Sequence, residues 1–457
     1  MGLSYRKNLW NLLKVRTRKS KSYKKTIKDN QRKAENIVRY AYHNSDFYYN
    51  LYRENHIDIN NFTLEELPII TKKDIIENYD TILTDNRLSK EIIEMYVQDK
   101  KEELLLGDYG IFSSGGSSGM RCHIPYDEKS MYMLNALTIL RSGLIKPQIT
   151  QRIAFLGGVN HTNNTKKLEK NSFLKNQFTI QTIPLFISEK EVVCRLNEFQ
   201  PTTIAAYSYM LRSLAIKQIN GELQISPTRM RCGGTPLSVA DREIIKRAFG
   251  IYPYENYGAS ESLLIASECD RHNGMHINED CYIVDFCNPQ KQGTLIEAEG
   301  ILITNPHNKV FPLIKYKLED KVTYTEERCQ CNSQFRRILS VNGREGEKFV
   351  FGATLVSPIE IVNRIYSVAM IDECRLIQKN KNHLEVRMVI AQKTMQEGTK
   401  KLIYDMIKKY LQQYGIANVE IVINICSELT KDSLSGKLVP FITMEKWKKF
   451  DGELKDK

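Results

Sequence analysis

The stretch FSSGGSSGMR, residues 112–121, holds four serines and three glycines directly after Ile111. Glycine lets a backbone approach a ligand closely, and successive N–H groups in such a loop form a concave nest that binds anions. Flexible surface linkers have the same composition. A Walker loop is excluded, because Met120 stands where its Gly-Lys-Ser/Thr ending would be needed. The stretch therefore predicts either a phosphate-binding loop of another type or a linker.

Between residues 151 and 260, short apolar runs alternate with helical patterns such as EKEVVCRLNEF (189–199) and SVADREIIKRAF (238–249). This alternation predicts a mostly parallel sheet with helices on its faces. Several runs end in Gly or Ser, at the strand ends where ligands bind in such sheets. The predicted strands are RIAFLGG (152–158), FTIQTIPL (178–185), TTIAAYS (202–208), MRCGG (230–234) and YPYENYG (252–258).

The flanking regions define the domains. Helical periodicity covers residues 31–55, and LPIITKKDIIENY (67–79) predicts a helix capped by its threonine. After about residue 275 the pattern changes to consecutive strands, and a small α+β pattern follows the charged junction GREGEK (343–348). We expect an α/β protein with a basic arm (1–30), a large domain (31–343) and a small mobile domain (344–457).

The bulk composition is that of an ordinary globular protein, with 457 residues, 42% hydrophobic and 26% charged. The sequence has no run of eighteen apolar residues, so no membrane span is expected. The start MGLSYRKNLW lacks the charged segment followed by an apolar segment that is typical of a signal peptide. The ten cysteines are scattered, which argues against a secreted disulfide scaffold. These features predict a cytoplasmic protein.

Positive charge is concentrated near the N-terminus. Residues 14–33 contain ten basic residues and one acidic residue, which is +9 of the net +12. Such an arm can associate weakly with an anionic membrane, which would make the protein peripheral at the inner membrane face. A solvated basic helix is the alternative that the composition favours. Aromatic residues are not interleaved with the basic ones, so no specific nucleic-acid binding is expected.

Six separated blocks occur in an order that resembles the adenylate-forming superfamily of acyl-CoA synthetases and adenylation domains. Within it the chain is most similar to the phenylacetate-CoA ligase and CapK-like group. The resemblance covers nearly the whole chain after residue 30, and the order of six blocks is more specific than any one of them. The blocks are SGGSSGMR (114–121), RCGGTPLS (231–238), ENYGASE (255–261), IKYKLED (314–320), GREGEK (343–348) and SGKL (435–438).

The resemblance implies that the Gly/Ser loop holds the β- and γ-phosphates of ATP through backbone N–H groups and the hydroxyls of Ser117 and Ser118. Related loops carry a lysine near their end. Here Met120 takes its place, so Arg121 is expected to supply the positive charge. The residues assigned to this loop are Ser114, Gly115, Gly116, Ser117, Ser118, Gly119 and Arg121.

In the same way Tyr257 is expected to stack on adenine, and Asp320 to accept hydrogen bonds from the ribose hydroxyls. Glu261 is expected to bind Mg²⁺, a cation that prefers carboxylate and phosphate oxygens. Glu319 stands where the family has glycine before the aspartate, a departure from its pattern. The nucleotide-binding residues assigned outside the loop are Gly233, Gly234, Thr235, Tyr257, Gly258, Ala259, Ser260 and Asp320.

Catalysis is assigned to Lys437, with Arg344 and Glu261. A mobile ammonium group bridging the acyl and phosphate oxygens would stabilise the charge that develops when a carboxylate attacks the α-phosphate. Surface solvation is the alternative role for a lone lysine. Arg344 resembles the nucleotide-contacting arginine of the family's hinge, where Gly346 replaces an aspartate.

The expected reaction is ATP-dependent activation of a small carboxylic acid, followed by transfer to a thiol of CoA or of a carrier protein. Gly352-Ala353 matches only loosely the glycine beside which pantetheine passes, which leaves open transfer to a non-thiol acceptor. A non-catalytic nucleotide-binding protein of an envelope-polysaccharide system is a further alternative, although it would not need Lys437. The acid pocket is expected to include Gly157, Gly158, His161, Tyr207 and Ser208.

Cys269, His276, Cys329 and Cys331 can supply three thiolates and an imidazole for a tetrahedral structural Zn²⁺. Their spacing alone is equally compatible with four unrelated residues. The resemblance implies the metal site, because relatives in the phenylacetate-CoA ligase group carry Cys, His and Cys-x-Cys at matching places. His272 and Cys281 are competing ligands of lower rank.

Overall fold

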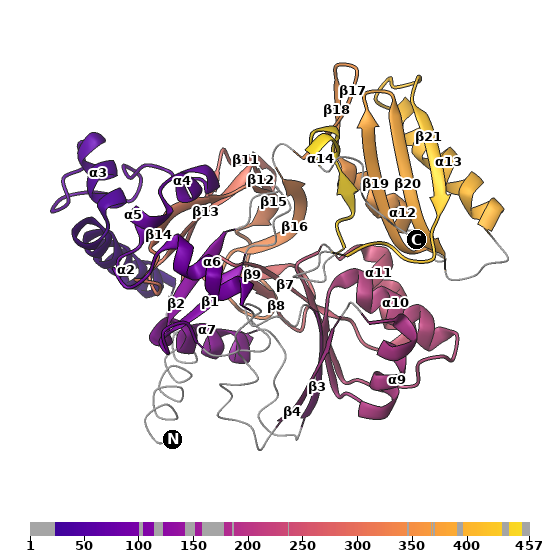
Figure 1. The fold of residues 1–457 in the computed structure, drawn as a ribbon, viewed down its shortest axis with the longest axis horizontal. Coiled ribbons are helices and arrows are strands. Elements are labelled where there is room, and N and C mark those ends of the chain that lie inside the picture. Colours follow the sequence, from indigo (N-terminus) through magenta and orange to yellow (C-terminus); the bar gives the residue numbers. More distant parts are fainter. Residues whose placement is uncertain are drawn as a thin grey trace.

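The computed structural model describes residues 23–99, 104–113, 122–141, 151–157, 178–184, 187–235, 237–344, 347–366, 368, 371–390, 396–431 and 438–449. For residues 135, 139, 178, 344 and 449 it describes the backbone alone. Figure 1 shows a large body and a smaller C-terminal unit beside the helices α10 and α11. In the described part of the chain, no helix is long and apolar enough to cross a membrane.

The N-terminal helices pack against the β-rich part of the large body. The periodicity over 31–55 predicts one helix, but the structure has two, because Ser45 adopts an extended conformation and caps the second by accepting from the Tyr48 N–H. Thr71 forms the predicted cap, with Asp74 completing a capping box. These helices are α2 (Tyr23–Asn44), α3 (Asp46–Glu54), α4 (Lys72–Glu77), α5 (Tyr79–Ile82) and α6 (Lys90–Gln98).

The arm boundary expected at residue 30 falls inside α2. Asn30 is buried and its amide donates to the Tyr282 carbonyl, while Lys33 Nζ donates to the Asp280 carbonyl at 2.7 Å. Residues 23–30 therefore belong to a helix that packs on the large domain. The rest of the basic arm, residues 1–22, lies outside the described residues.

A hairpin and one helix precede the main sheet. Strands β1 (Tyr109–Ser113) and β2 (His123–Asp127) pair antiparallel, with Ser113 opposite His123, and α7 (Glu128–Arg141) follows. The Gly/Ser loop therefore connects the two strands of this hairpin.

The main sheet has eleven strands in the order β11-β12-β15-β16-β9-β8-β7-β6-β5-β3-β4. From β4 to β7 neighbouring strands run parallel, as predicted, and α9 (Glu189–Phe199), α10 (Ser208–Ile219) and α11 (Val239–Phe249) lie between them in sequence. The parallel strands are β3 (Gln151–Gly157), β4 (Phe178–Pro184), β5 (Thr203–Ala206), β6 (Arg229–Gly233) and β7 (Tyr254–Ala259).

Beyond β7 the sheet continues antiparallel, which explains the run of consecutive strands after residue 275. These strands are β8 (Leu263–Glu268), β9 (Met275–Ile277), β11 (Gln290–Gln292), β12 (Leu295–Ala298), β15 (Asp320–Thr325) and β16 (Arg337–Arg344). A separate three-stranded sheet consists of β10 (Ile283–Cys287), β13 (Gly300–Asn305) and β14 (Leu313–Leu318).

The small domain has its own core and a four-stranded sheet of order β21-β20-β19-β22. Leu429 and Leu438 are not part of this core, and they pack with α10 of the large domain. The elements are β17 (Phe349–Phe351), β18 (Thr354–Val356), α12 (Pro358–Tyr366), β19 (Ile371–Asn380), β20 (His383–Ile390), α13 (Gln396–Gln412), β21 (Glu420–Ile425), β22 (Phe441–Ile442) and α14 (Met444–Lys449).

Candidate nucleotide site and metal centre

Two residues assigned to the nucleotide from different blocks are in direct contact. Tyr257 on β7 is 9% exposed, and its hydroxyl donates to Asp320 Oδ2 at 2.7 Å. Asp320 begins β15, where its backbone pairs with that of Arg344 on β16. A carboxylate has about four lone-pair sites, so the bond with Tyr257 leaves Asp320 capacity for ribose hydroxyls. The adenine, ribose and hinge residues of the predicted site thus meet at one place in the main sheet.

Glycine is required at two positions of this site for steric reasons. A Cβ on Gly258 would lie 1.8 Å from the Leu263 carbonyl oxygen, because the β7–β8 pair is irregular between Tyr257 and Gly258. Gly234 has φ +75°, and a Cβ there would lie 3.0 Å from the ring of Tyr207. The backbone after β6 and at the end of β7 therefore lies closer to its surroundings than any other residue permits.

Glu261 is a buried carboxylate next to the start of the Gly/Ser loop. It is 6% exposed, and Tyr316 on β14 donates its hydroxyl to Glu261 Oε1 at 3.2 Å. The preceding Ser260 donates its hydroxyl to the carbonyl of Ser113, the last residue of β1, at 2.7 Å. One buried carboxylate beside the predicted phosphate-binding loop fits Mg²⁺, which takes few protein ligands and shares the rest with substrate phosphates and water.

Tyr126 on β2 fixes the backbone of the same turn. Its hydroxyl donates to the Glu261 carbonyl at 2.7 Å and to the Ser260 carbonyl at 3.0 Å. Burial raises the pKa of the Tyr126 phenol well above its usual value of 10, so the group stays protonated and remains a donor. The hairpin that carries the Gly/Ser loop is thereby tied to the turn that carries Glu261.

Some residues assigned to the acid pocket contact the segment after β6, which contains Gly234 and Thr235, at the start of α10. Ser208 donates its backbone N–H to Thr235 Oγ1 at 3.1 Å, and the two hydroxyl oxygens are 2.6 Å apart. Tyr207 lies against Gly234, and Gly157 ends the neighbouring strand β3. Gly157, Tyr207 and Ser208 therefore lie at the carboxyl ends of parallel strands, the usual ligand side of such sheets.

Several assigned residues lie outside the described part of the chain. They are Ser114, Gly115, Gly116, Ser117, Ser118, Gly119, Arg121, Gly158, His161 and Lys437, together with the side chain of Arg344. Their roles stay predictions. Within the described part, Ala259 ends β7 and Gly233 ends β6, both beside the residues discussed above.

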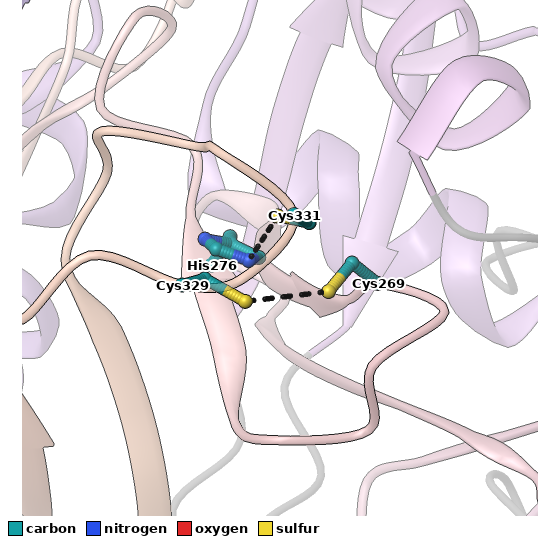
Figure 2. A group of neighbouring side chains, drawn as sticks. All are labelled: Cys269, His276, Cys329 and Cys331. Carbon is teal, nitrogen blue, oxygen red and sulfur yellow. Dashed lines mark hydrogen bonds between the residues drawn. The ribbon is translucent and has the colours of Figure 1, made fainter.

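The structure brings Cys269, His276, Cys329 and Cys331 together, and their ligand atoms all lie within 4.8 Å of one another. Figure 2 shows them converging from the end of β8, from β9 and from the loop between β15 and β16. Asn332, which follows the Cys-x-Cys pair, has φ +63°, the left-handed conformation that asparagine tolerates.

Two of the distances between the ligand atoms match those around a tetrahedral zinc ion. Sγ of Cys269 is 3.8 Å from Sγ of Cys329, and Sγ of Cys331 is 3.3 Å from Nε2 of His276. Two ligands about 2.0–2.3 Å from a zinc ion at tetrahedral angles lie about 3.3–3.8 Å apart. A sulfur–sulfur distance of 3.8 Å is far from the length of a disulfide, about 2.05 Å.

The two competing ligands lie elsewhere. His272 Nδ1 is 3.3 Å from Glu268 Oε2, and Cys281 is a separate, fully buried thiol. The four-residue set is therefore the one that geometry favours among the described residues. Burial raises the pKa of the Cys269 thiol to about 12, so a bound cation is what would make it a thiolate.

The residues that support the site were missed from the sequence. In the sequence, Tyr126 and Tyr316 look like ordinary aromatic residues of strands, and Ser113 looks like the first residue of a loop. Tyr316 lies inside the quoted IKYKLED block, four residues before Asp320, but nothing in that pattern indicates a partner 55 residues away. Only the pairing of distant strands creates these contacts.

Comparisons with known proteins agree with this geometry. No protein-family model matches the chain. The chain is 24% identical to the protein CapK of Staphylococcus aureus over 311 residues, which is 64% of this chain and 62% of CapK, so the match spans less than two thirds of that relative.

Solved structures with a similar fold include 2-hydroxyisobutyryl-CoA ligase. Its postadenylation state, in complex with R3-HIB-AMP, matches with a TM-score of 0.70 at 12% identity, covering 96% of this chain and 94% of that one. Its thioesterification state, in complex with 2-HIB-AMP and CoA, matches with a TM-score of 0.58 at the same identity and coverage. The resemblance expected from the sequence blocks is thus confirmed at the level of fold. With its large N-terminal and small C-terminal domains, the chain has the fold of the adenylate-forming ligases.

Proposed function

We propose that this protein activates a carboxylic acid with ATP and transfers the acyl group to a thiol. A carboxylate oxygen attacks the α-phosphorus, the bond to the bridging oxygen breaks, and pyrophosphate leaves. The thiolate of CoA or of a carrier pantetheine then attacks the acyl carbon, and AMP leaves as the C–O bond breaks. Both steps are displacements that need no oxidant or reductant.

The contact between Tyr257 and Asp320 carries the proposal. A tyrosine beside a partly exposed carboxylate, with Arg344 paired opposite, provides a flat ring for a base and an acceptor for a ribose. Ser260 and Glu261 lie between this pair and the hairpin of the Gly/Ser loop. These two sets of contacts support an order of base, ribose and phosphate along the site.

Glu261 and Lys437 are assigned to stabilise the negative charge of the ATP phosphates and of the reacting oxygens. Glu261, held by Tyr316, would bind Mg²⁺, which when bound supplies positive charge to the ATP phosphates. Lys437 would donate hydrogen bonds to the acyl and α-phosphate oxygens as negative charge develops there. Its loop begins after Lys431 and ends at Leu438, which packs with α10.

The comparisons support this reading without naming the substrate. 2-Hydroxyisobutyryl-CoA ligase, a solved relative in fold, is described with bound acyl-adenylates and in two of its structures also with CoA. CapK is the relative in sequence. The acid, and the choice between CoA and a carrier protein, are left to experiment.

Zinc is proposed as a structural ion. Cys269, His276, Cys329 and Cys331 would fill all four positions of a tetrahedral site, which leaves no open position for a substrate. The site would join the loop after β8 to the loop after β15, the strand that begins with Asp320. It would thereby hold the two halves of the nucleotide site together.

A panel of carboxylic acids scored by pyrophosphate release, with and without CoA, tests the proposal. Lys437→Ala should slow adenylation about 10²- to 10³-fold while ATP still binds. The exposed Lys401→Ala on α13 is the control and should match the parent. Full activity of Lys437→Ala would contradict the catalytic assignment. Release that depends on the acid but never consumes CoA would favour a non-thiol acceptor, and ATP binding without turnover of any acid would favour the non-catalytic alternative.

A further inference from the structure

Arg212 is a buried charge among the apolar residues in the middle of α10. It lies near the middle of α10, where its neighbours Leu211 and Leu214 belong to the core. Its side chain is 1% exposed and lies 2.9 Å from Asp241, whose side chain is 7% exposed. Burying an arginine is costly unless its donors are satisfied, so the contacts of this group deserve an explanation beyond packing.

The guanidinium of Arg212 reaches across to the small domain. Its Nε donates to the Ile371 carbonyl at 2.9 Å, and its Nη2 donates to the Val368 carbonyl at 3.0 Å. Val368 lies between α12 and β19, and Ile371 is the first residue of β19. The ring of Tyr366 at the end of α12 lies 5.5 Å from the guanidinium carbon. One side chain of the large domain thus binds the point where a helix of the small domain turns into its central sheet.

The third partner of Arg212, Asp241, connects it to the loop between β6 and α11. Nη1 donates to Asp241 Oδ1 at 2.9 Å. The other oxygen of Asp241 accepts from the backbone and hydroxyl of Ser238, in the capping box that starts α11. One helical turn before Arg212, Ser208 holds Thr235 of the same loop. The loop between β6 and α11 is therefore bound to α10 at Ser208 and at Arg212.

We propose that Arg212 is a positioning residue that holds the small domain in the orientation used for adenylation. Through Asp241 it also fixes the position of the small domain relative to the loop between β6 and α11. This inference rests on the proposed function, since it assigns the observed arrangement to the first of the two steps. The chain superposes better on the postadenylation state of 2-hydroxyisobutyryl-CoA ligase, TM-scores 0.70 and 0.68, than on its open and thioesterification forms, 0.57 and 0.58. The arrangement in which Arg212 reaches Val368 and Ile371 thus resembles the postadenylation state of that ligase.

Arginine suits this role because its planar fork can serve three acceptors in fixed directions. A lysine at the same position has one nitrogen on a flexible stem, so it can pair with Asp241 but cannot also hold both carbonyls. The contacts to the small domain are two hydrogen bonds to neutral carbonyls, which water can replace when the domain moves. The ion pair with Asp241 stays within the large domain in either position.

The test compares Arg212→Gln and Arg212→Lys with Arg195→Gln, which removes an exposed i,i+4 pair with Glu191 on α9. With any acid that is turned over, both Arg212 variants should slow pyrophosphate release about 10- to 100-fold. Thioester formation from supplied acyl-adenylate and CoA should stay within about threefold, and Arg195→Gln should match the parent in both steps. Equal loss in both steps, or loss in neither, would overturn the positioning role.

A second measurement does not depend on the reaction. Small-angle X-ray scattering of the full chain should show a larger radius of gyration for both Arg212 variants, because the small domain is less firmly docked. An unchanged radius would overturn the proposal even if no acid were ever turned over. Arg212→Lys keeps the pair with Asp241 and guards against misfolding of the glutamine variant. If Arg212→Lys matched the parent in both scattering and kinetics, the claim that the planar guanidinium is needed would also be overturned.

Discussion

The nucleotide region and the interface between the domains are held by different kinds of contact. Around Ser260 and Glu261, tyrosine hydroxyls donate to backbone carbonyls and to one carboxylate, and all partners belong to the large domain. At the interface, charged side chains pair within each domain, and Arg212 donates across it to two carbonyls of the small domain. Arg212 pairs with Asp241, Lys217 pairs with Glu189, and Lys431 pairs with Glu373 next to a further buried acid, Asp372.

The difference has a physical consequence. Buried neutral hydrogen bonds to backbone define one geometry, because a broken one leaves an unsatisfied group in the interior. The hydrogen bonds from Arg212 to the small domain can be replaced by water when the domains separate, while its ion pair stays within the large domain, so the net free energy of the contact is small. A site that must keep its shape and an interface that must open and close would be expected to differ in this way.

The largest expected effect comes from breaking the nucleotide region at its metal site. Cys331→Ser should lose zinc and lower the free energy of unfolding by more than about 3 kcal/mol, because metal binding is coupled to folding. Metal analysis of protein without a metal-binding tag, together with thermal unfolding, measures both effects. Cys194→Ser, at an exposed cysteine of α9, is the control. Folded, active parent protein without metal would rule out the site.

The next effect sharpens the ribose assignment. Asp320→Ala should weaken ATP binding by about 1.5 to 3 kcal/mol, the range for hydrogen bonds to a charged group. Calorimetric titration with ATP measures it. Glu319→Ala is a matched control, since Glu319 is the exposed neighbour. If Glu319→Ala lost affinity and Asp320→Ala did not, the alignment of the IKYKLED block would be wrong.

At the interface the expected effect depends on pH. The pKa of Asp372 is raised to about 7, chiefly by burial and also by Glu189 and Glu373, against the opposing effects of Lys217 and Arg212. An acid with a raised pKa in the folded protein destabilises it progressively as the pH climbs from about 4 to about 7, after which the penalty is constant.

Asp372→Asn removes this penalty. The variant should gain stability over the parent by about 1 to 2 kcal/mol between pH 5 and pH 8. Denaturant unfolding at several pH values gives the difference directly, and other titrating groups cancel because both proteins carry them. A difference that is flat with pH would show that Asp372 is ionised throughout this range.

The smallest expected effect separates two functions of Tyr257. Tyr257→Phe keeps the ring for adenine but removes the bond to Asp320, so ATP affinity should fall by about 0.5 to 1.5 kcal/mol. Titration of Tyr257→Phe and Tyr257→Leu with ATP distinguishes the contributions, because leucine also removes the ring. Equal affinities of the two variants would mean that the ring does not stack on the base.

The sequence predicted the regular parts of the molecule better than its long-range contacts. Alternation between residues 151 and 260 predicted the parallel strands and the helices α9 and α11, because one period dominates each segment. The break at Ser45 was missed, since the apolar spacing continues across it and only the local backbone conformation reveals the cap. The metal ligands came from the family resemblance rather than from spacing. Arg212 gave no signal, because its small-domain acceptors lie 156 and 159 residues further along the chain.

The position of the cysteine pairs bears on how the chain matures during synthesis. Cys269 and Cys329 are 60 residues apart, an interval that takes a ribosome about 3 to 12 seconds at 5–20 residues per second. During that time β9 has only β8 as a neighbour, since β16, its other partner in the sheet, has not been made. A complete tetrahedral site cannot exist before Cys331 emerges. The proposed zinc site would be complete before β16 is made, so a bound ion would hold β9 in place for the strand that pairs with it next.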